Sequence, residues 1–531
     1  MMKFRLISLL VCLMLFSACT RPPDLTVSVD HQVVPTDNRE ITTTDAILST
    51  EGMAMLAPQW QWPRSAPEEQ GMSSAVLADM LEYIRAENKP VHSLLVIRHG
   101  TLVLEAYIHP FNADTRHGVY SVTKSVTSAL VGTAIGEGSL ADVDTAVVSC
   151  FSSVAVDDPE KEKIQIKHLL TMTSGIEWTE VLYSGLNDLW GIIESDDPAQ
   201  YFFNPALIEE PGTTFNYNSG GSHLLSMLVQ DAVGESAADY AADQLFGPLG
   251  ITDYAWESDF TGHSIGGTGL ELLPVDMAKL GLLYLNEGRW QGRQVLDPAW
   301  VNDSIQAQSR PADDKGYGYQ WWVNPGGDYY ALGWGGQQIH MFPAQDMVVV
   351  FTAGSSGVDM LHEDLINGFL LPAVVSIESL PEDAEGQTRL LAAIQMLEQL
   401  QKHASTPASS MAENVDGKEW LITGMGEWSM FTLHFPNEVE AILDLTVNGD
   451  PMPLQVGLDG FYRVTDTQEL GPVAMSGYWE SENTFVLDQQ NLREADRRLT
   501  RIVFSGETVK IISEWFVEPH QEETEAILFT H

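Results

Sequence analysis

Two sets of apolar strand patterns lie far apart in the sequence, and helical patterns lie between them. Residues 94–100 and 101–107 predict an antiparallel hairpin that turns at His99–Gly100, and residues 337–342 and 346–352 predict two more strands. Helices are expected between these strands, at residues 222–233, 274–286 and 298–306. A sheet that unites such distant strands needs helices packed on it. The sequence therefore predicts an α/β (α+β) domain with an antiparallel sheet and flanking helices.

The C-terminal part of the chain shows a different pattern, which predicts a second domain. Alternating apolar residues run into hairpin turns at Asn448–Gly449 and Asp459–Gly460, and strand-like stretches follow at residues 484–487, 501–504 and 509–515. Residues 404–410 are rich in Ser, Ala and Pro and are typical of a linker. We expect residues 411–531 to form a small antiparallel β domain, a barrel or a sandwich. It carries no evident catalytic set, so we expect the chemistry to survive its removal.

The N-terminus has the layout of a secretory signal. Lys3 and Arg5 precede an apolar run at residues 6–16, which is too short to span a membrane, and small residues follow. Residues 15–19 also resemble a bacterial lipoprotein cleavage box, in which Cys19 is lipidated and becomes the first residue of the mature chain. Simple cleavage near Ala18 is the alternative. We therefore expect an exported protein, periplasmic or in the cell envelope and anchored through a lipid at Cys19.

Cysteine usage and composition complete the domain prediction. Of the three cysteines, Cys12 and Cys19 fall in the signal, so Cys150 remains alone and no intramolecular disulfide is expected. A polar, Pro- and Thr-containing stretch follows the signal and is typical of a tether. The predicted order is a signal peptide, a tether, the main domain, a helix with a linker and the β domain, at residues 1–19, 20–58, 59–375, 376–410 and 411–531.

The charge balance excludes some classes of partner. The chain has 74 acidic and 27 basic residues, a net charge of −47, which repels nucleic acid and anionic membrane surfaces. We expect neither as a partner, apart from the lipid anchor. A hydrated, soluble surface explains this charge better than the steering of cationic ligands does. A hydrophobic content of 44% with 14 Trp excludes a disordered protein.

A candidate nucleophile and its activating amine lie three residues apart, in Ser121-Val122-Thr123-Lys124. This is the only Ser-x-x-Lys in the chain, and apolar residues recur at helical spacing after it. Residues i and i+3 share a helix face, so the Lys124 amine can reach the Ser121 hydroxyl. A buried lysine can lose its charge through desolvation and accept a proton near neutral pH. Because such a motif also arises by chance, its position at a helix start gives it weight.

Residues 65–375 resemble the serine β-lactamase and penicillin-binding-protein superfamily, nearest to its class C-like esterases and amide hydrolases, which include the nylon-oligomer hydrolases. The resemblance implies a helical subdomain beside the sheet. It is carried by motifs in chain order, at residues 120–124, 168–175, 211–220, 246–251, 266–270, 276–281 and 333–337.

The resemblance assigns the nucleophile to Ser121, with Lys124 and Tyr217 as the groups that move its proton. A phenol beside an ammonium has a lowered pKa, so Tyr217 can act as a base toward Ser121 and then as an acid toward the leaving group. The alternative is a packed aromatic ring in a Pro-Gly turn.

The oxyanion hole is also implied by the resemblance. Its donors would be the backbone N–H groups of Ser121 and Gln337, and the small residues Gly335 and Gly336 would let substrate approach that backbone. Trp334 is expected to form an apolar wall of the acyl site or simply to pack.

Two departures from the family pattern bear on the substrate. The Tyr-x-Asn element is here Tyr217-Asn218-Ser219, so Ser219 places a hydroxyl where the family's amide contacts substrate. The Lys-Thr-Gly or His-x-Gly element aligns with Trp334-Gly335-Gly336, which lacks the cation or imidazole. Both losses weaken recognition of a β-lactam carboxylate. We therefore expect hydrolysis of a small carboxylic ester or amide. Alternatives are a weak β-lactamase, a D-amino-acid peptidase, or a binding protein that retains the fold.

The remaining polar residues are expected to have structural roles rather than catalytic or metal-binding ones. Five histidines lack metal-ligand spacing and are expected to be ordinary core or surface residues, namely His117, His168, His223, His263 and His340. Gly266–Gly269 is expected to be a turn near the active site. Glu177 and Glu180 are expected to be solvated loop carboxylates rather than activators of water. No metal or organic cofactor is expected, and the sequence leaves the oligomeric state open.

Overall fold

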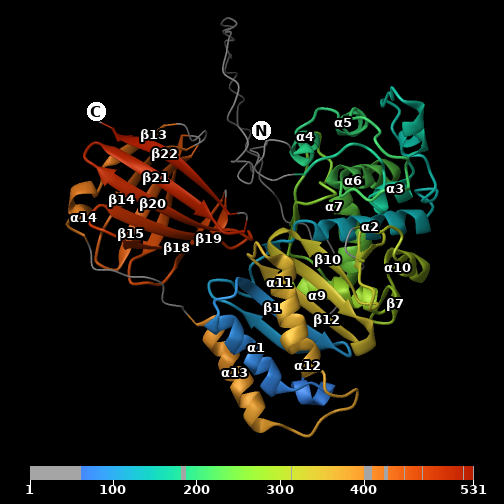
Figure 1. Ribbon diagram of the computed structural model, residues 1–531, viewed down its shortest axis with the longest axis horizontal. Coiled ribbons are helices and arrows are strands. Elements are labelled where there is room, and N and C mark those ends of the chain that lie inside the picture. The colour runs from blue at the N-terminus through green and yellow to red at the C-terminus, as the bar shows by residue number, and fades with distance from the viewer. Residues whose placement is uncertain are drawn as a thin grey trace, which may run out of the picture.

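The computed structural model describes residues 61–180, 187–311, 314–399, 409–423, 428–447, 449–468, 470–517 and 519–529. The described residues exclude the predicted signal, the predicted lipidation site at Cys19, the predicted tether and most of the predicted linker at 404–410. Figure 1 shows the described residues as a domain built on a central sheet, here the sheet domain (residues 61–399), and a β-barrel (residues 409–529).

A seven-stranded antiparallel sheet forms the centre of the sheet domain. Its order is β2-β1-β12-β11-β10-β9-β8. The strands are β1 (Val91–Arg98), β2 (Thr101–Tyr107), β8 (Gly316–Tyr317), β9 (Trp322–Val323), β10 (Tyr329–Gly333), β11 (Gln337–Phe342) and β12 (Met347–Ala353). β1 pairs with β12, with Leu95 opposite Val350. The prediction that one sheet unites the two ends of this segment is confirmed.

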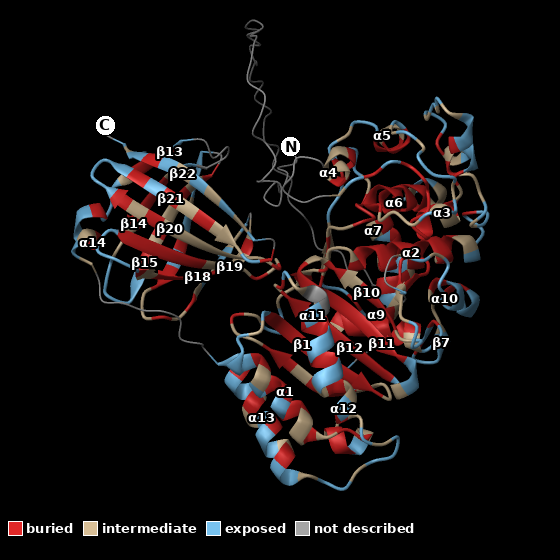
Figure 2. Cartoon of the chain, viewed as in Figure 1, coloured by how far each residue is buried: buried red, intermediate tan, exposed pale blue. Residues whose placement is uncertain are grey.

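Both faces of this sheet are buried, and the side-chain alternation of β1 shows why. Leu95 and Ile97 belong to one apolar core, and Leu94 and Val96 belong to the other. Successive side chains of a strand point to opposite faces, so a continuous apolar run fits a sheet covered on both sides. Figure 2 shows the resulting band of buried residues along the sheet.

The helices that cover one face come from the two ends of the sheet domain. They are α1 (Ser74–Ala86), α11 (Val358–Leu365), α12 (Leu371–Ala373) and α13 (Ala384–Glu398). The apolar residues at 390–403 predict a helix at those positions. Helix α13 begins earlier, because the Asp383 side chain accepts the Gly386 N–H and caps the helix there. Leu390 and Leu397 of α13 are buried in the same core as α1.

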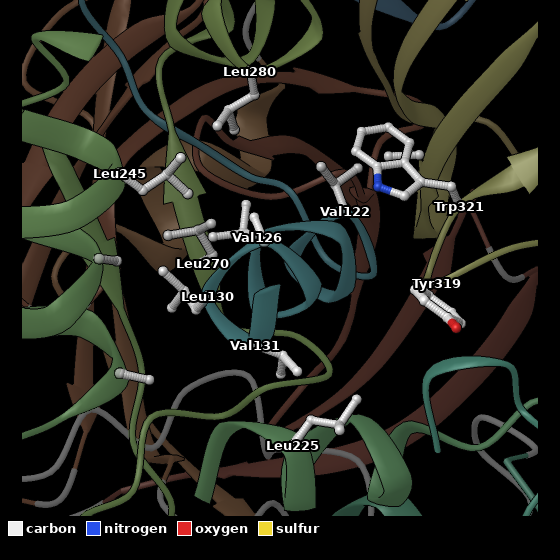
Figure 3. Close-up of a cluster of buried hydrophobic side chains, with 14 of the residues drawn as sticks. Val122, Val126, Leu130, Val131, Leu225, Leu245, Leu270, Leu280, Tyr319 and Trp321 are labelled. Atoms are coloured by element: carbon white, nitrogen blue, oxygen red, sulfur yellow. The ribbon is translucent and has the colours of Figure 1, made fainter. Parts of the chain in front are cut away.

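Helix α2 (Val122–Gly136) lies under the other face and is buried almost all round. Figure 3 shows Val122, Val126 and Leu130 of α2 among apolar side chains from other elements, including Leu225, Leu270 and Trp321. Each fully buried Val or Leu side chain contributes about 1.5–3 kcal/mol. A Cβ at Gly132 would lie 2.4 Å from the Trp300 ring, so this glycine permits the close approach of helix α10 (Pro298–Ser304). The Ser121–Lys124 motif therefore lies at the start of a tightly packed helix.

A group of helices beyond α2 forms the predicted helical subdomain. It contains α3 (Ile166–Leu170), α4 (Asp188–Ile193), α5 (Pro198–Phe203), α6 (Ser219–Val233), α7 (Ala237–Ala241) and α8 (Gly247–Leu249). Helices α9 (Pro274–Leu285) and α10 (Pro298–Ser304) complete the sheet domain, with small sheets of β3 (His117–Gly118), β4 (Tyr254–Trp256) and β5 (Leu270–Leu272), and of β6 (Arg289–Trp290) and β7 (Arg293–Gln294). Within the described residues, no helix has the length and apolar character that crossing a membrane requires.

The C-terminal strands close into a barrel after the short helix α14 (Ser410–Val415). The strands are β13 (Glu419–Thr423), β14 (Trp428–His434), β15 (Glu440–Val447), β16 (Asp450–Gly457), β17 (Arg463–Thr467), β18 (Gly471–Trp479), β19 (Thr484–Asn491), β20 (Arg497–Ser505), β21 (Thr508–Trp515) and β22 (His520–Leu528). A bridge between Gly457 and Ser476 joins β16 to β18 and closes the ring. Of the two architectures expected, the structure has the barrel.

Candidate active site

Ser121 and Lys124 lie at the start of α2, in the arrangement that their spacing predicts. Ser121 is the N-cap residue. The Lys124 Nζ donates to the Ser121 Oγ at 2.8 Å and to the carbonyl of Gly267 at 2.7 Å. Lys124 is only 1% exposed, so these two oxygens fix its amine in a protein environment. The pair thus joins a hydroxyl to a buried amine, as nucleophilic catalysis requires.

Tyr217 comes from the loop before α6 and faces the same amine. The Lys124 Nζ lies 4.9 Å from the centre of the Tyr217 ring. The Tyr217 ring also lies nearly parallel to the Trp322 ring, with centroids 6.3 Å apart and planes 16° apart. The structure thus brings all three predicted catalytic residues together, and the proton-transfer role of Tyr217 stays a prediction.

The glycine-rich segment at Gly266–Gly269 holds the lysine in place. Gly267 supplies the carbonyl that accepts from Lys124, and Gly266 supplies one that accepts from Thr127 of α2 at 2.9 Å. A Cβ at Gly266 would lie 2.2 Å from the carbonyl oxygen of Ser222, so only glycine permits this contact with α6. The expectation that this segment turns near the active site is confirmed.

Ser219 begins α6, and its polar groups are bound to Glu180. Its hydroxyl donates to Glu180 Oε2 at 2.8 Å, and its backbone N–H donates to Glu180 Oε1. Trp178 Nε1 donates to the same Oε1 at 2.6 Å. Ser219 is 1% exposed, and its contact with substrate stays a prediction.

The prediction that Glu180 is a solvated loop carboxylate is wrong. It accepts three hydrogen bonds and ties the Trp178 loop to the turn that carries Tyr217, whereas Glu177 is exposed as expected. No local sequence pattern indicates this role, because Glu180 and Ser219 lie 39 residues apart.

The predicted oxyanion turn lies between β10 and β11, where Trp334–Gly336 forms a short 3-10 turn. Gly335 and Gly336 have φ of 77° and 101°, which favours glycine at both positions. The Gln337 side chain fixes the turn: its Nε2 donates to the carbonyls of Trp334 (2.9 Å) and Ala353 (2.8 Å), and its Oε1 accepts from the Ala353 N–H (3.0 Å). Use of the Gln337 N–H as an oxyanion donor stays a prediction.

His362 supports this turn from α11. Its Nε2 lies 3.2 Å from the carbonyl oxygen of Gly336. Burial lowers the pKa of His362 to about 3, so the ring is neutral and donates its Nε2 proton to that carbonyl. The sequence analysis did not identify this residue.

The residue before the nucleophile, Tyr120, touches the barrel. Its hydroxyl donates to Glu494 Oε2 and accepts from the Ala495 N–H at 3.2 Å. The Tyr120 ring meets the Trp334 ring edge-on, with centroids 5.2 Å apart. Trp334 thus packs against Tyr120, and packing was one of the two roles expected of it. Glu494 lies 374 residues from Tyr120, and no sequence pattern links them.

The histidines singled out in the sequence have partners within the fold. His223 Nε2 pairs with Asp259 at 2.9 Å, His340 Nε2 pairs with Asp328 at 2.7 Å, and His117 Nε2 lies 3.0 Å from the Nδ1 of His92. No group of three His, Cys, Asp or Glu side chains that could hold a metal ion occurs in the part of the chain that the structure describes.

The chain is similar to a known protein family, to two hydrolases and to a solved structure. A family model described as Beta-lactamase matches residues 77–366. The 6-aminohexanoate-dimer hydrolase of Paenarthrobacter ureafaciens is 27% identical over 313 residues, covering 54% of this chain and 79% of that protein. The D-aminopeptidase of Brucella anthropi is 27% identical over 215 residues, covering 37% of this chain and 36% of that protein. The solved structure of a putative 6-aminohexanoate-dimer hydrolase from Bacillus anthracis has a TM-score of 0.50 at 20% identity, covering 61% of this chain and 89% of that chain.

Proposed function

This chain belongs to the beta-lactamase family of serine hydrolases, and we propose that it cleaves a carboxylic ester or amide through an acyl-enzyme at Ser121. The observation that carries this proposal is the contact of 2.8 Å between the Lys124 Nζ and the Ser121 Oγ. A binding protein that had lost catalysis would have no need of a buried amine aimed at a hydroxyl.

Acylation begins with attack of the Ser121 Oγ on the substrate carbonyl carbon. The hydroxyl proton passes to the Lys124 and Tyr217 pair, in which the amine nitrogen lies 4.9 Å from the ring centre. The carbonyl oxygen becomes an oxyanion, which the backbone N–H groups of Ser121 and Gln337 stabilise. When the intermediate collapses, the bond to the alcohol or amine breaks, and the leaving group takes the proton from the same pair.

Deacylation runs through the same groups in reverse order. A water molecule attacks the acyl carbonyl and gives its proton to the Lys124 and Tyr217 pair. The bond to the Ser121 Oγ breaks, Ser121 regains a proton, and the carboxylic acid leaves. One ester or amide bond and one water are consumed in each cycle.

The test is covalent labelling with a fluorophosphonate probe, read by mass spectrometry of the intact protein and its peptides. We expect one adduct per chain, on Ser121, and none on Ser121→Ala. Labelling of Ser121→Ala to the wild-type extent would overturn the proposal. Thermal melting of both proteins checks that the variant is folded.

The substrate class is the second part of the proposal. The relative from Paenarthrobacter ureafaciens is named for the hydrolysis of a 6-aminohexanoate dimer, and this name favours an amide substrate. The turn between β10 and β11 carries Trp334 rather than a cation, which disfavours a β-lactam carboxylate. A panel of nitrophenyl esters, the 6-aminohexanoate dimer, D-aminoacyl amides and nitrocefin discriminates these classes. We expect ester or linear amide turnover to exceed nitrocefin turnover.

We also propose that the protein is exported and anchored by a lipid at Cys19. The support is the basic and apolar N-terminal pattern and the cysteine that follows it. In cells grown with a labelled fatty acid, the wild type should carry the label and sediment with membranes. Cys19→Ala should lose the label, and a label retained by this variant would refute the proposal.

A further inference from the structure

The hairpin that joins β19 to β20 of the barrel is a fixed structure. The Gln490 Nε2 donates to the carbonyl of Asp496 at 3.0 Å, across the base of the hairpin. Asp496 Oδ1 accepts the backbone N–H groups of Phe516 and Val517, both at 3.0 Å. Leu492 is buried, and Phe111 of the sheet domain packs against its cluster. The hairpin is therefore held from both domains.

The hairpin contacts the segment that leads into the catalytic serine. The Gly118 N–H donates to the Arg493 carbonyl at 2.8 Å. Two residues later, the Tyr120 hydroxyl donates to the Glu494 carboxylate and accepts from the Ala495 N–H. The Tyr120 hydroxyl thus makes two hydrogen bonds to the barrel, one as a donor to a side chain and one as an acceptor from a backbone group.

Tyr120 has a backbone conformation that needs such support. Its φ is 46°, in the left-handed region that a bulky residue rarely adopts. A conformation of this kind costs about 1–3 kcal/mol and persists only where the surroundings impose it. Because Tyr120 directly precedes Ser121, its backbone sets the direction of the Ser121 N–H. Burial raises the pKa of Tyr120 well above its ordinary value, so the hydroxyl remains a donor to Glu494.

The same hairpin also packs against the oxyanion turn. A Cβ built on Gly335 would lie only 2.4 Å from the Ala495 Cβ, so the Ala495 methyl group lies directly against this glycine. A Cβ on Gly354, which follows β12, would lie 2.2 Å from the Ala495 carbonyl oxygen. The hairpin therefore contacts the chain close to both predicted oxyanion donors. Tyr120 directly precedes Ser121, and Gly335 lies two residues before Gln337.

We propose that the barrel hairpin at residues 491–496 is part of the active site, and that Glu494 is a positioning residue that acts through Tyr120 on the oxyanion hole. This inference rests on the proposed function. It argues against our expectation that the chemistry survives removal of the β domain, because truncation would remove the acceptor of the Tyr120 hydroxyl.

The experiment compares Glu494→Ala, Glu494→Gln, Tyr120→Phe and the double variant Glu494→Ala/Tyr120→Phe in the full-length protein. The readouts are kcat and KM for a nitrophenyl ester that the wild type turns over, the rate of fluorophosphonate labelling, and thermal melting. Glu507→Ala is the matched control, since Glu507 is exposed in the β20–β21 turn of the same barrel. Tyr120→Phe removes the hydroxyl from the sheet-domain side and leaves the sequence of the barrel unchanged.

We expect Glu494→Ala and Tyr120→Phe each to lower kcat about 10–100-fold, less than the loss of a direct oxyanion donor, with KM changed less than threefold. Glu494→Gln, which keeps an acceptor oxygen, should restore at least half of the lost rate on a logarithmic scale. The double variant should be no slower than the slower single variant, because both act through one contact.

The proposal is overturned if folded Glu494→Ala labels and turns over as Glu507→Ala does, or if the two losses multiply. A wild type that never labels at Ser121 would instead refute the proposed function, and the two failures are thereby separated.

Discussion

The Lys124 amine donates to the Ser121 hydroxyl oxygen at 2.8 Å and to the Gly267 carbonyl at 2.7 Å. The second contact fixes the position of the amine beside the serine hydroxyl. With the amine donating to the serine oxygen, the serine proton must leave toward another group. Tyr217, whose ring centre lies 4.9 Å from the same nitrogen, is the predicted acceptor of that proton.

The first prediction concerns this shared proton transfer. Lys124→Ala and Tyr217→Phe should each lower kcat about 10²–10⁴-fold, the range for loss of a general base. Adding either change to Ser121→Ala should lower the residual rate little further, because the three groups act as one unit. Steady-state kinetics with one ester substrate measures this. Multiplicative losses in the combined variants would contradict a common mechanism.

A second prediction tests the contact between the oxyanion turn and the barrel. Gly335→Ala places a Cβ 2.4 Å from the Ala495 Cβ at a backbone φ of 77°, so kcat should fall at least about 10-fold, equivalent to about 1.4 kcal/mol. The control is Gly100→Ala, which has a similar φ of 70° but meets no other atom within 4 Å. Adding Ala495→Gly should restore part of the Gly335→Ala loss. No rescue would show that the backbone strain alone is responsible.

The third prediction concerns the Gln337 side chain. Gln337→Met keeps the size of the side chain but leaves the Trp334 and Ala353 groups without their partner, at a cost of about 1–3 kcal/mol for each buried group. The free energy of unfolding should therefore fall, and kcat should fall with it. Urea unfolding and ester kinetics measure the two effects. The exposed Gln306→Met should change neither, and equal behaviour of the two variants would contradict the role of Gln337.

Glu180 gives a fourth prediction. Glu180→Ala removes the acceptor of the Ser219 hydroxyl and of the Trp178 indole, and so loosens the turn that carries Tyr217. We expect kcat/KM to fall about 10-fold or more, equivalent to about 1.4 kcal/mol. Glu177→Ala, an exposed carboxylate in the same loop, is the matched control. A loss of the same size in both variants would assign the effect to general charge rather than to the contact.

The fifth prediction concerns stability in acid. Burial lowers the pKa of His117 to about 4, whereas an unfolded histidine titrates near about 6.5. Between these values the unfolded state binds the proton and the folded state does not, so stability falls as the pH falls from about 6.5 to about 4. The full effect is on the order of 3 kcal/mol.

Urea unfolding of the wild type and His117→Gln at pH 7 and pH 5 measures this contribution. The variant should lose less stability than the wild type on acidification. The control is His434→Gln, because the His434 side chain is 43% exposed, and this variant should lose as much stability as the wild type does. An unchanged pH dependence in His117→Gln would assign the acid sensitivity to other groups.

The sequence identified the elements whose signals are local. The apolar runs of β1 and β12 predict two strands of one sheet. In the structure, alternate side chains of each strand enter two different cores, one on each face of the sheet. Ser121 and Lys124 could be paired because three residues on a helix fix their separation. The start of α13 was missed because its apolar period begins only at Leu390, whereas Asp383 caps the helix earlier.

The sequence by itself determined four strands of the central sheet, the pairing of Ser121 with Lys124 and the family resemblance, because periodicity, short spacings and ordered motifs are written along the chain. Only the tertiary structure decided that Glu180 binds Ser219, that the strands after residue 410 close into a barrel, and that Glu494 reaches Tyr120. The physical reason is common to all three. Contacts between residues 39 or 374 positions apart depend on how whole elements pack, and no local propensity or period encodes that packing.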